Sequence, residues 1–205
     1  MNRRTWILCT IAYPGPLLTD VGITALYGAG NFQVHDPMLN TIEKAIARVV
    51  DFVGQLTCLF LILMVLNVSF DVMMRYVFHN SSVGMQELEW HLFAVVILLG
   101  ISVALKDEGH VRVDFLYDTL SVRKKAVINI IGTLFFLIPV ALLIFFGSFE
   151  FVKDSWEIGE ISEDPGGLPY RWLIKGMIPV SFGFLLFSAV GYVLQNIRIY
   201  REAKK

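Results

Sequence analysis

The residues with the greatest capacity for chemistry are four histidines and two cysteines. Only His91 falls in a long apolar stretch, where it follows Glu87 by four residues and would share a helix face with it. Haem b in a membrane needs histidines on two helices, and the other three lie in connecting segments (His35, His79 and His110). Cys9 and Cys58 stand far apart, and no Cys-x-x-Cys or His-x-x-Glu-His spacing occurs. The sequence therefore predicts no cofactor and no metal site.

Charged residues border the apolar stretches and do not interrupt them. Asp51, Asp71, Glu89 and Lys175 are each predicted at a helix end, where water is within reach. An ionisable group at mid-membrane would indicate a proton or ion pathway, but the apolar stretches hold only neutral polar side chains. We therefore expect that the chain is not an enzyme and cannot couple an ion gradient by itself.

The elements that position these residues are four apolar runs. The chain has 205 residues, 56% of them hydrophobic and 17% charged, which is too apolar for an ordinary soluble domain. A hydrocarbon layer about 30 Å thick needs about 20 apolar helical residues. The predicted spans are residues 52–70, 88–105, 126–149 and 173–194. We predict an all-α integral membrane protein with four transmembrane helices and short interfacial helices.

The distribution of Lys and Arg predicts the orientation of these helices. The segment before the first span has four, the loop over residues 106–125 has five, and the segment after residue 194 has four. The other two loops contain three together. Because cytoplasmic loops carry the excess of basic residues, we expect both termini in the cytoplasm.

Three segments follow from this reading: residues 1–40, a four-helix membrane domain over residues 41–200, and a basic cytoplasmic tail over residues 201–205. Two arginines followed by the apolar residues 6–13 resemble a signal peptide. Cleavage there would export the new N-terminus, against the charge distribution. We therefore expect residues 1–40 to form an interfacial or partner-bound segment.

Small residues recur along the last predicted helix. Gly176, Gly183 and Gly191 stand seven and eight residues apart, close to one stripe, and Gly100 with Ala104 makes a smaller patch of the same kind. Such residues let another backbone approach closely. The stripe is compatible equally with packing against a second membrane protein and with packing among the four helices of this chain.

The outer connections are rich in charge. Asp71 and Arg75 have the i,i+4 spacing of an ion pair, and Glu87 and Glu89 suit the positive end of the second helix. The loop over residues 150–172 holds six acidic and two basic residues around Pro165-Gly166-Gly167, which predicts a rigid acidic turn. Its charge is compatible with steering a basic patch of a soluble partner or with simple solvation.

Four short motifs occur in order on this scaffold, followed by a fifth in the last loop. They are Arg75-Tyr76-Val77-Phe78, Gln86-Glu87-Leu88-Glu89-Trp90-His91, Leu98-Leu99-Gly100, His110-Val111-Arg112-Val113-Asp114, and residues 165–175 with Ile178-Pro179-Val180. In sequence and spacing they resemble the small permease (Q, DctQ-type) subunit of tripartite ATP-independent periplasmic (TRAP) transporters. The last motif resembles the mannitol or chloroaromatic branch. The resemblance covers about residues 41–200.

The resemblance implies a non-catalytic small subunit of a sodium-coupled transporter for small organic acids, in the bacterial inner membrane. Its implied partners are a large multi-span transport subunit, which would hold the sodium and substrate sites, a periplasmic solute-binding protein and membrane lipids; nucleic acid is not expected. Many family members carry Trp-x-Glu-Glu at the start of the second span, and only Glu87 matches that acidic pair here. Expected interface or motif residues are Arg75, Glu87, Glu89, Trp90, Gly100, His110, Arg112, Asp114, Gly176, Gly183 and Gly191; expected docking residues are Glu160, Glu163, Asp164 and Arg171.

Two other classes of protein are compatible with a four-span chain. One is the membrane anchor of an oxidoreductase, with or without haem, which the histidine distribution argues against. The other is a small dimeric exporter, which would need a charged residue within the bilayer.

Overall fold

The computed structural model describes residues 37–106 and 120–203, and these form long helices. Helix α3 covers Pro37–Val77, α4 covers Val83–Lys106, and α8 covers Trp172–Glu202. A further rod consists of α6 (Val122–Gly132), a π-helical turn η2 (Thr133–Leu137) and α7 (Ile138–Glu157). The predicted role of residues 1–36 falls outside the described residues, and so does that of His110, Arg112 and Asp114.

Within the described part of the chain, four helical stretches are long and apolar enough to cross a membrane, which confirms the predicted all-helical, four-span fold. They are Thr41–Val77, Val83–Lys106, Val122–Glu157 and Trp172–Arg201, each longer than its predicted span. The second is complete despite its short uncharged run, because α4 begins at Val83 and its first two turns, which include Glu87 and Glu89, precede the apolar stretch. At a rise of about 1.5 Å per residue α4 is about 36 Å long, enough to span the hydrocarbon.

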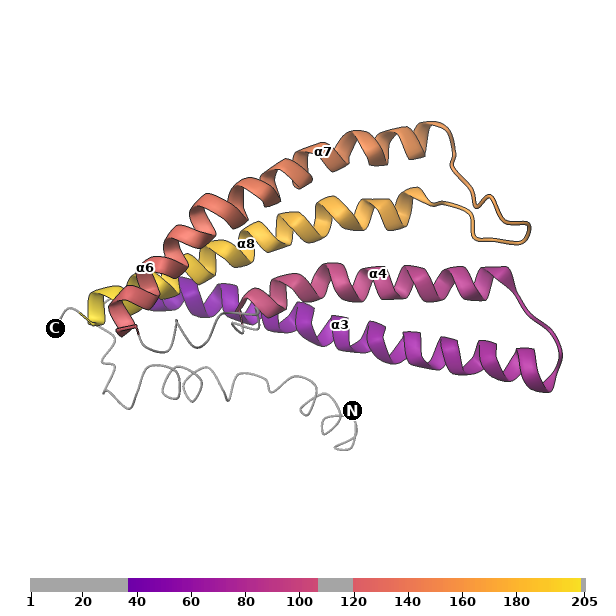
Figure 1. Ribbon diagram of the computed structural model, residues 1–205, viewed down its shortest axis with the longest axis horizontal. Coiled ribbons are helices and arrows are strands. Elements are labelled where there is room, and N and C mark those ends of the chain that lie inside the picture. Colours follow the sequence, from indigo (N-terminus) through magenta and orange to yellow (C-terminus); the bar gives the residue numbers. More distant parts are fainter. Residues whose placement is uncertain (1–36, 107–119, 204–205) are drawn as a thin grey trace.

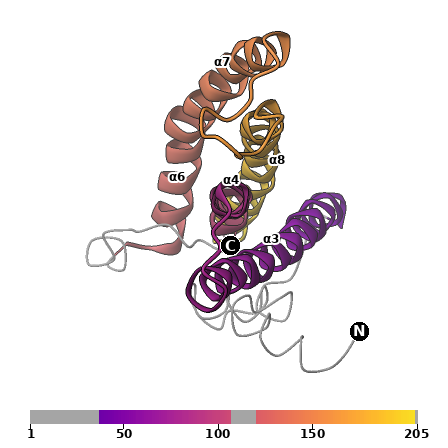
Figure 2. The same cartoon turned by 90° about the vertical axis from the view of Figure 1, so that its right-hand side faces the viewer.

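The helices are arranged as two antiparallel hairpins in a row. The order across the molecule is α7, α8, α4 and α3, with α4 and α8 in the middle (Figures 1 and 2). Helix α8 contacts α3, α4, α6 and α7 and so joins the two hairpins. Residues 78–82 and 158–171 lie at one end, which we call the loop end; α3 and α6 begin, and α4 and α8 finish, at the opposite end, which we call the terminal end (Figure 1).

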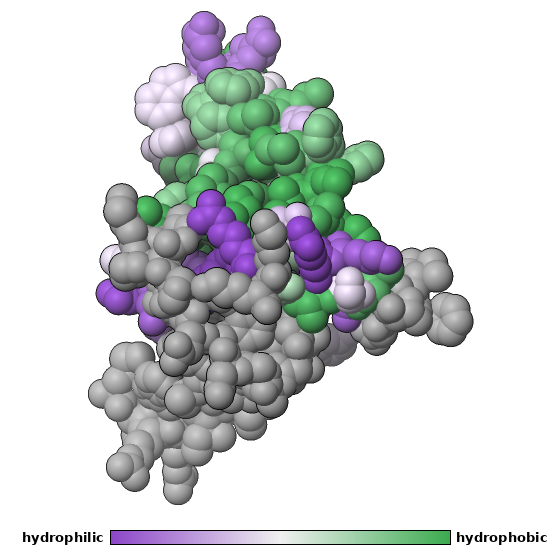
Figure 3. Space-filling model, turned by 90° about the vertical axis from the view of Figure 1, so that its left-hand side faces the viewer, coloured by the Kyte–Doolittle hydropathy of each residue, from purple (hydrophilic) through white to green (hydrophobic). Residues whose placement is uncertain are grey.

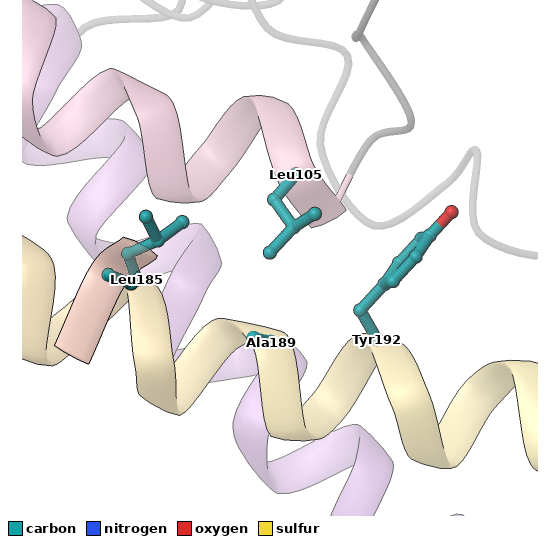
Figure 4. Close-up of a cluster of buried hydrophobic side chains, with 5 residues drawn as sticks. Leu105, Leu185, Ala189 and Tyr192 are labelled. Atoms are coloured by element: carbon teal, nitrogen blue, oxygen red, sulfur yellow. The ribbon is translucent and has the colours of Figure 1, made fainter. Parts of the chain in front are cut away.

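The buried apolar core is small and lies around α8. Leu105 of α4 points between Leu185 and Tyr192 of α8, beside the fully buried Ala189 (Figure 4). A second cluster of Ile46, Val50 and Val103 packs α3 on α4 at the terminal end. Large apolar side chains cover the outer surface, for example Phe136 and Leu143, which are 73% and 74% exposed. Such a surface suits lipid as the surrounding solvent.

The glycines of α8 divide into two groups. A Cβ at Gly191 would lie 2.7 Å from Ile46 of α3, and one at Gly183 would lie 3.0 Å from the Phe145 ring of α7. These two glycines therefore permit close packing within this chain. Gly176, also on α8, has open space where a side chain would be, and so has Gly100 of α4.

The terminal end holds a polar network between helices. Lys106 of α4 forms an ion pair with Asp51 of α3, and Arg198 of α8 bonds to Glu43 of α3 at 2.8 Å. Asn129 of α6 donates to Asn196 of α8 at 2.9 Å. Figure 3 views this end and shows hydrophilic side chains gathered beside a largely apolar surface.

The prediction that Asp51 lies at a helix end is wrong. Helix α3 begins at Pro37 and runs on through Asp51, because no glycine or proline follows Pro37 until Gly54. The carboxylate is buried and tolerated there because Lys106 neutralises it.

The rod that consists of α6, η2 and α7 bends between α6 and α7 (Figure 1), where the π-helical turn precedes Pro139.

Candidate functional site

A buried carboxylate, Glu87 in the second turn of α4, connects this helix to the α7–α8 loop. One of its oxygens accepts hydrogen bonds from the Ser162 hydroxyl and, at 3.4 Å, from the Arg171 guanidinium. The other accepts the backbone N–H of Leu168. These three hydrogen bonds tie the loop to α4, and hydrogen bonds to a charged acceptor are stronger than neutral ones.

Two glycines make this approach of the loop to α4 sterically feasible. A Cβ on Gly167 would lie 2.4 Å from Ser162 and 2.8 Å from the Glu87 carboxylate. A Cβ on Gly84, one turn earlier on α4, would lie 3.3 Å from the Gly166 carbonyl oxygen. Position 167 therefore requires glycine because a side chain would collide with Ser162 and Glu87. Position 166 favours glycine for a different reason, since its φ is +85°.

The loop is also closed on itself, as in a compact Ω-loop. The Arg171 N–H donates to the Glu160 carbonyl at 3.2 Å, and the Ser162 N–H donates to the Leu168 carbonyl at 3.3 Å. At its base the Trp156 and Trp172 rings meet edge to face, with centroids 4.4 Å apart. These contacts show that the loop forms a closed turn with internal hydrogen bonds.

Lys175 forms a second ionic contact beneath the loop. Its ammonium bonds to the Glu160 carboxylate and lies 4.1 Å from the centre of the Phe151 ring. The hydrogen bond from Lys175 lowers the pKa of Glu160 below its ordinary value, so this carboxyl is ionised at neutral pH.

The structure separates the four expected docking residues into two pairs. Glu163 and Asp164 are exposed in the α7–α8 loop. Glu160 and Arg171 are half-buried and bond to Lys175 and Glu87 within this chain. Of these four residues, Glu163 and Asp164 therefore present their charge to solvent, whereas the charges of Glu160 and Arg171 are already in ion pairs.

The expected motif residues also have different surroundings. Arg75 pairs with the buried Asp71 at 2.6 Å, which confirms the predicted i,i+4 contact. Trp90 is 70% exposed and Glu89 is half-buried. The His91 ring contacts the Glu87 backbone carbonyl at 2.6 Å, as expected for an i,i+4 neighbour.

The long-range contacts of Glu87 were not found from the sequence. Glu87 was expected to suit the start of its own helix, whereas its carboxylate holds Ser162 and Leu168, more than seventy positions later. The glycine pair after Pro165 was the available signal, since adjacent glycines often permit close backbone approach. That signal identifies a tight turn but not its partner.

The two ends of the described bundle carry opposite charge. Eight basic and three acidic residues lie at the terminal end, a net charge of +5. Four basic and nine acidic residues lie at the loop end, a net charge of −5. No group of three metal-ligating side chains occurs in the described ranges. The arrangement is suited to orientation in a membrane and to binding of other proteins.

Comparison with known proteins identifies the family of the chain. Residues 64–199 match the family described as tripartite ATP-independent periplasmic transporters, DctQ component. The chain is 29% identical over 120 residues to the sialic acid TRAP transporter permease protein SiaT of Haemophilus influenzae (strain 86-028NP); the alignment covers 58% of this chain but only 19% of that longer protein. Since the family match includes part or all of every spanning helix, the chain belongs to the DctQ family of TRAP transporter components and is a multi-pass protein of the bacterial inner membrane.

Proposed function

We propose that this chain is the non-catalytic scaffold of a sodium-coupled TRAP transporter for small organic acids. The family match across residues 64–199 is the observation that carries this proposal. The chain would fix a large transport subunit in the membrane through its broad apolar helix faces. Family membership favours this role over an oxidoreductase anchor or a small exporter.

The opposite charges of the two ends support an orientation. We place the terminal end, with its net charge of +5, in the cytoplasm together with both chain termini, and the loop end in the periplasm. The α7–α8 loop would then face a periplasmic solute-binding protein.

The choice of substrate would depend on the other components, which would hold the substrate and sodium sites. The similar protein SiaT is named for sialic acid, an acidic solute, which supports an organic acid as cargo. The finer assignment to the mannitol or chloroaromatic branch rests on the motif over residues 165–175, much of which lies in the loop that Glu87 holds.

The role in docking rests on the loop end. Glu163 and Asp164 would attract a basic patch of the binding protein, since exposed charges raise association rates. Glu160 and Arg171 would contribute indirectly, by holding the shape of the loop.

Deletion of this chain tests the proposal. Sodium-driven uptake in cells or proteoliposomes that contain the large subunit and the binding protein should be lost without it and restored by adding it back. Co-purification from native membranes should recover the large subunit. Full uptake without this chain would refute the scaffold role.

A further inference from the structure

Two isoleucines of the α7–α8 loop, which follows the spanning stretch Val122–Glu157, have largely exposed side chains. Ile158 is 74% exposed and Ile161 is 66% exposed. The last apolar run of α7 ends at Phe149, and α7 then continues to Glu157. At helical rise, Ile158 lies about 13 Å of helix axis beyond Phe149.

The residues between Phe149 and Ile158 indicate where the hydrocarbon ends. This last part of α7 carries Glu150, Lys153, Asp154 and Glu157, all exposed. Trp156, which contacts Trp172, is typical of the membrane–water interface. This charge pattern indicates that the hydrocarbon ends before Ile158, and exposed apolar side chains beyond that level are typical of an interaction surface.

The loop presents these side chains on a rigid support. Ile161 directly precedes Ser162, whose hydroxyl bonds to Glu87 and whose backbone N–H bonds to Leu168. Ile158 caps α7, and its N–H donates to the Asp154 carbonyl at 3.1 Å. Because the backbone beside both residues is already hydrogen-bonded, binding through them does not require this part of the loop to be ordered first.

Acidic side chains surround the two isoleucines along the chain. Asp154 and Glu157 precede them, and Glu163 and Asp164 follow. Glu157 has an exposed ion pair with Lys153 at 3.5 Å, a weak contact that solvent screens. An apolar centre with a charged rim is the usual composition of a protein–protein interface.

We propose that Ile158 and Ile161 are the apolar anchors of the docking surface, and that they enter an apolar pocket ringed by lysine and arginine on the soluble binding protein. This inference rests on the proposed function. It differs from charge-based docking, because the isoleucines determine how long the complex lasts and the acidic residues determine how fast it forms.

Binding kinetics on the assembled membrane complex, reconstituted in nanodiscs, test the proposal. Ile158→Ser and Ile161→Ser should each raise the dissociation rate of the binding protein at least about tenfold, with little dependence on salt. The charge reversal Glu163→Lys with Asp164→Lys should instead lower the association rate, most strongly at low salt. Ile42→Ser, at an exposed isoleucine of the terminal end, is the matched control and should change neither rate.

The outcomes distinguish the isoleucine anchors from docking of the binding protein at this loop in general. Unchanged dissociation in the isoleucine variants, with slower association after charge reversal, would overturn the anchors and leave docking at this loop intact. No change in either set would overturn both. Loss of the large subunit from the purified isoleucine variants would assign these residues to the membrane assembly and would also overturn the anchor proposal.

The position of Ile161 relative to lipid is a second test. A spin label at Ile161→Cys, with Cys9 and Cys58 replaced by serine, should be relaxed by a water-soluble nickel complex in the free membrane complex and protected when the binding protein is added. Relaxation mainly by lipid-soluble oxygen would place Ile161 in the membrane and overturn the proposal.

Discussion

Replacement of Gly167 by alanine should release the α7–α8 loop from the bundle. The added Cβ would lie 2.4 Å from Ser162 and 2.8 Å from the Glu87 carboxylate, whereas ordinary contacts begin at 3.4 Å. The loop must therefore move by about 1 Å, more than the hydrogen bonds from Ser162 and Leu168 to Glu87 can absorb. Overpacking of this kind costs about 1 to 3 kcal/mol.

That cost corresponds to an increase of about 5- to 150-fold in the population of the open loop. Amide hydrogen exchange reports this population directly, because the Leu168 N–H is hydrogen-bonded to Glu87 in the closed loop. We expect exchange over residues 160–171 to accelerate by that factor in Gly167→Ala. Exchange in the centre of α8 should not change.

The matched control is Gly100→Ala, which adds the same methyl group on α4 where nothing lies within 4 Å. It should leave loop exchange unchanged. A second variant combines Gly167→Ala with Ser162→Gly and so removes the side chain that the new methyl group contacts most closely. It should recover part of the packing but not the hydrogen bond from Ser162 to Glu87. Loop exchange in Gly167→Ala equal to that of the unmodified chain would refute the steric reasoning.

Two further predictions concern other contacts. Gly191→Ala should separate α3 from α8 at Ile46 and destabilise the bundle by about 1 to 3 kcal/mol, whereas Gly176→Ala should not; thermal unfolding in detergent distinguishes them, and equal midpoints would contradict the assignment. The Glu160–Lys175 pair lowers the pKa of Glu160, so its stabilisation should be complete above the ordinary value of 4.5 and disappear as the pH falls through the lowered pKa. The stability difference between the unmodified chain and Glu160→Gln, followed by tryptophan fluorescence, should therefore be constant above pH 4.5 and shrink as the pH falls below that value; a difference that stays constant in acid would count against the pair.

Several elements of the fold were accessible from local sequence. The long apolar runs predicted four spans because uncovered backbone polar groups are not tolerated in lipid. The contact of Arg75 with Asp71 was predicted from a spacing of four residues on one helix. In each case the physical constraint acts within one segment, so the sequence contains it in full.

Long-range contacts were less accessible. The glycine stripe of α8 was compatible with internal packing or with an external partner, and only the positions of Ile46 and Phe145 assign Gly191 and Gly183 to internal packing. The burial of Asp51 was missed because its partner, Lys106, lies on the next helix. The contact of Glu160 with Lys175 was missed for the same reason, since one residue lies in the loop and the other on α8, fifteen positions later.

The sequence by itself determined that this chain has four membrane-spanning helices and belongs with the small TRAP subunits, because composition, charge distribution and short motifs are local properties. Only the tertiary structure decided that Glu87 holds the α7–α8 loop and that Glu163 and Asp164 remain free of the contacts that hold Glu160 and Arg171. A carboxylate has the same sequence signature whether it caps its own helix or accepts hydrogen bonds from a distant loop. The difference is set by the packing that brings α4 and the loop within hydrogen-bonding distance.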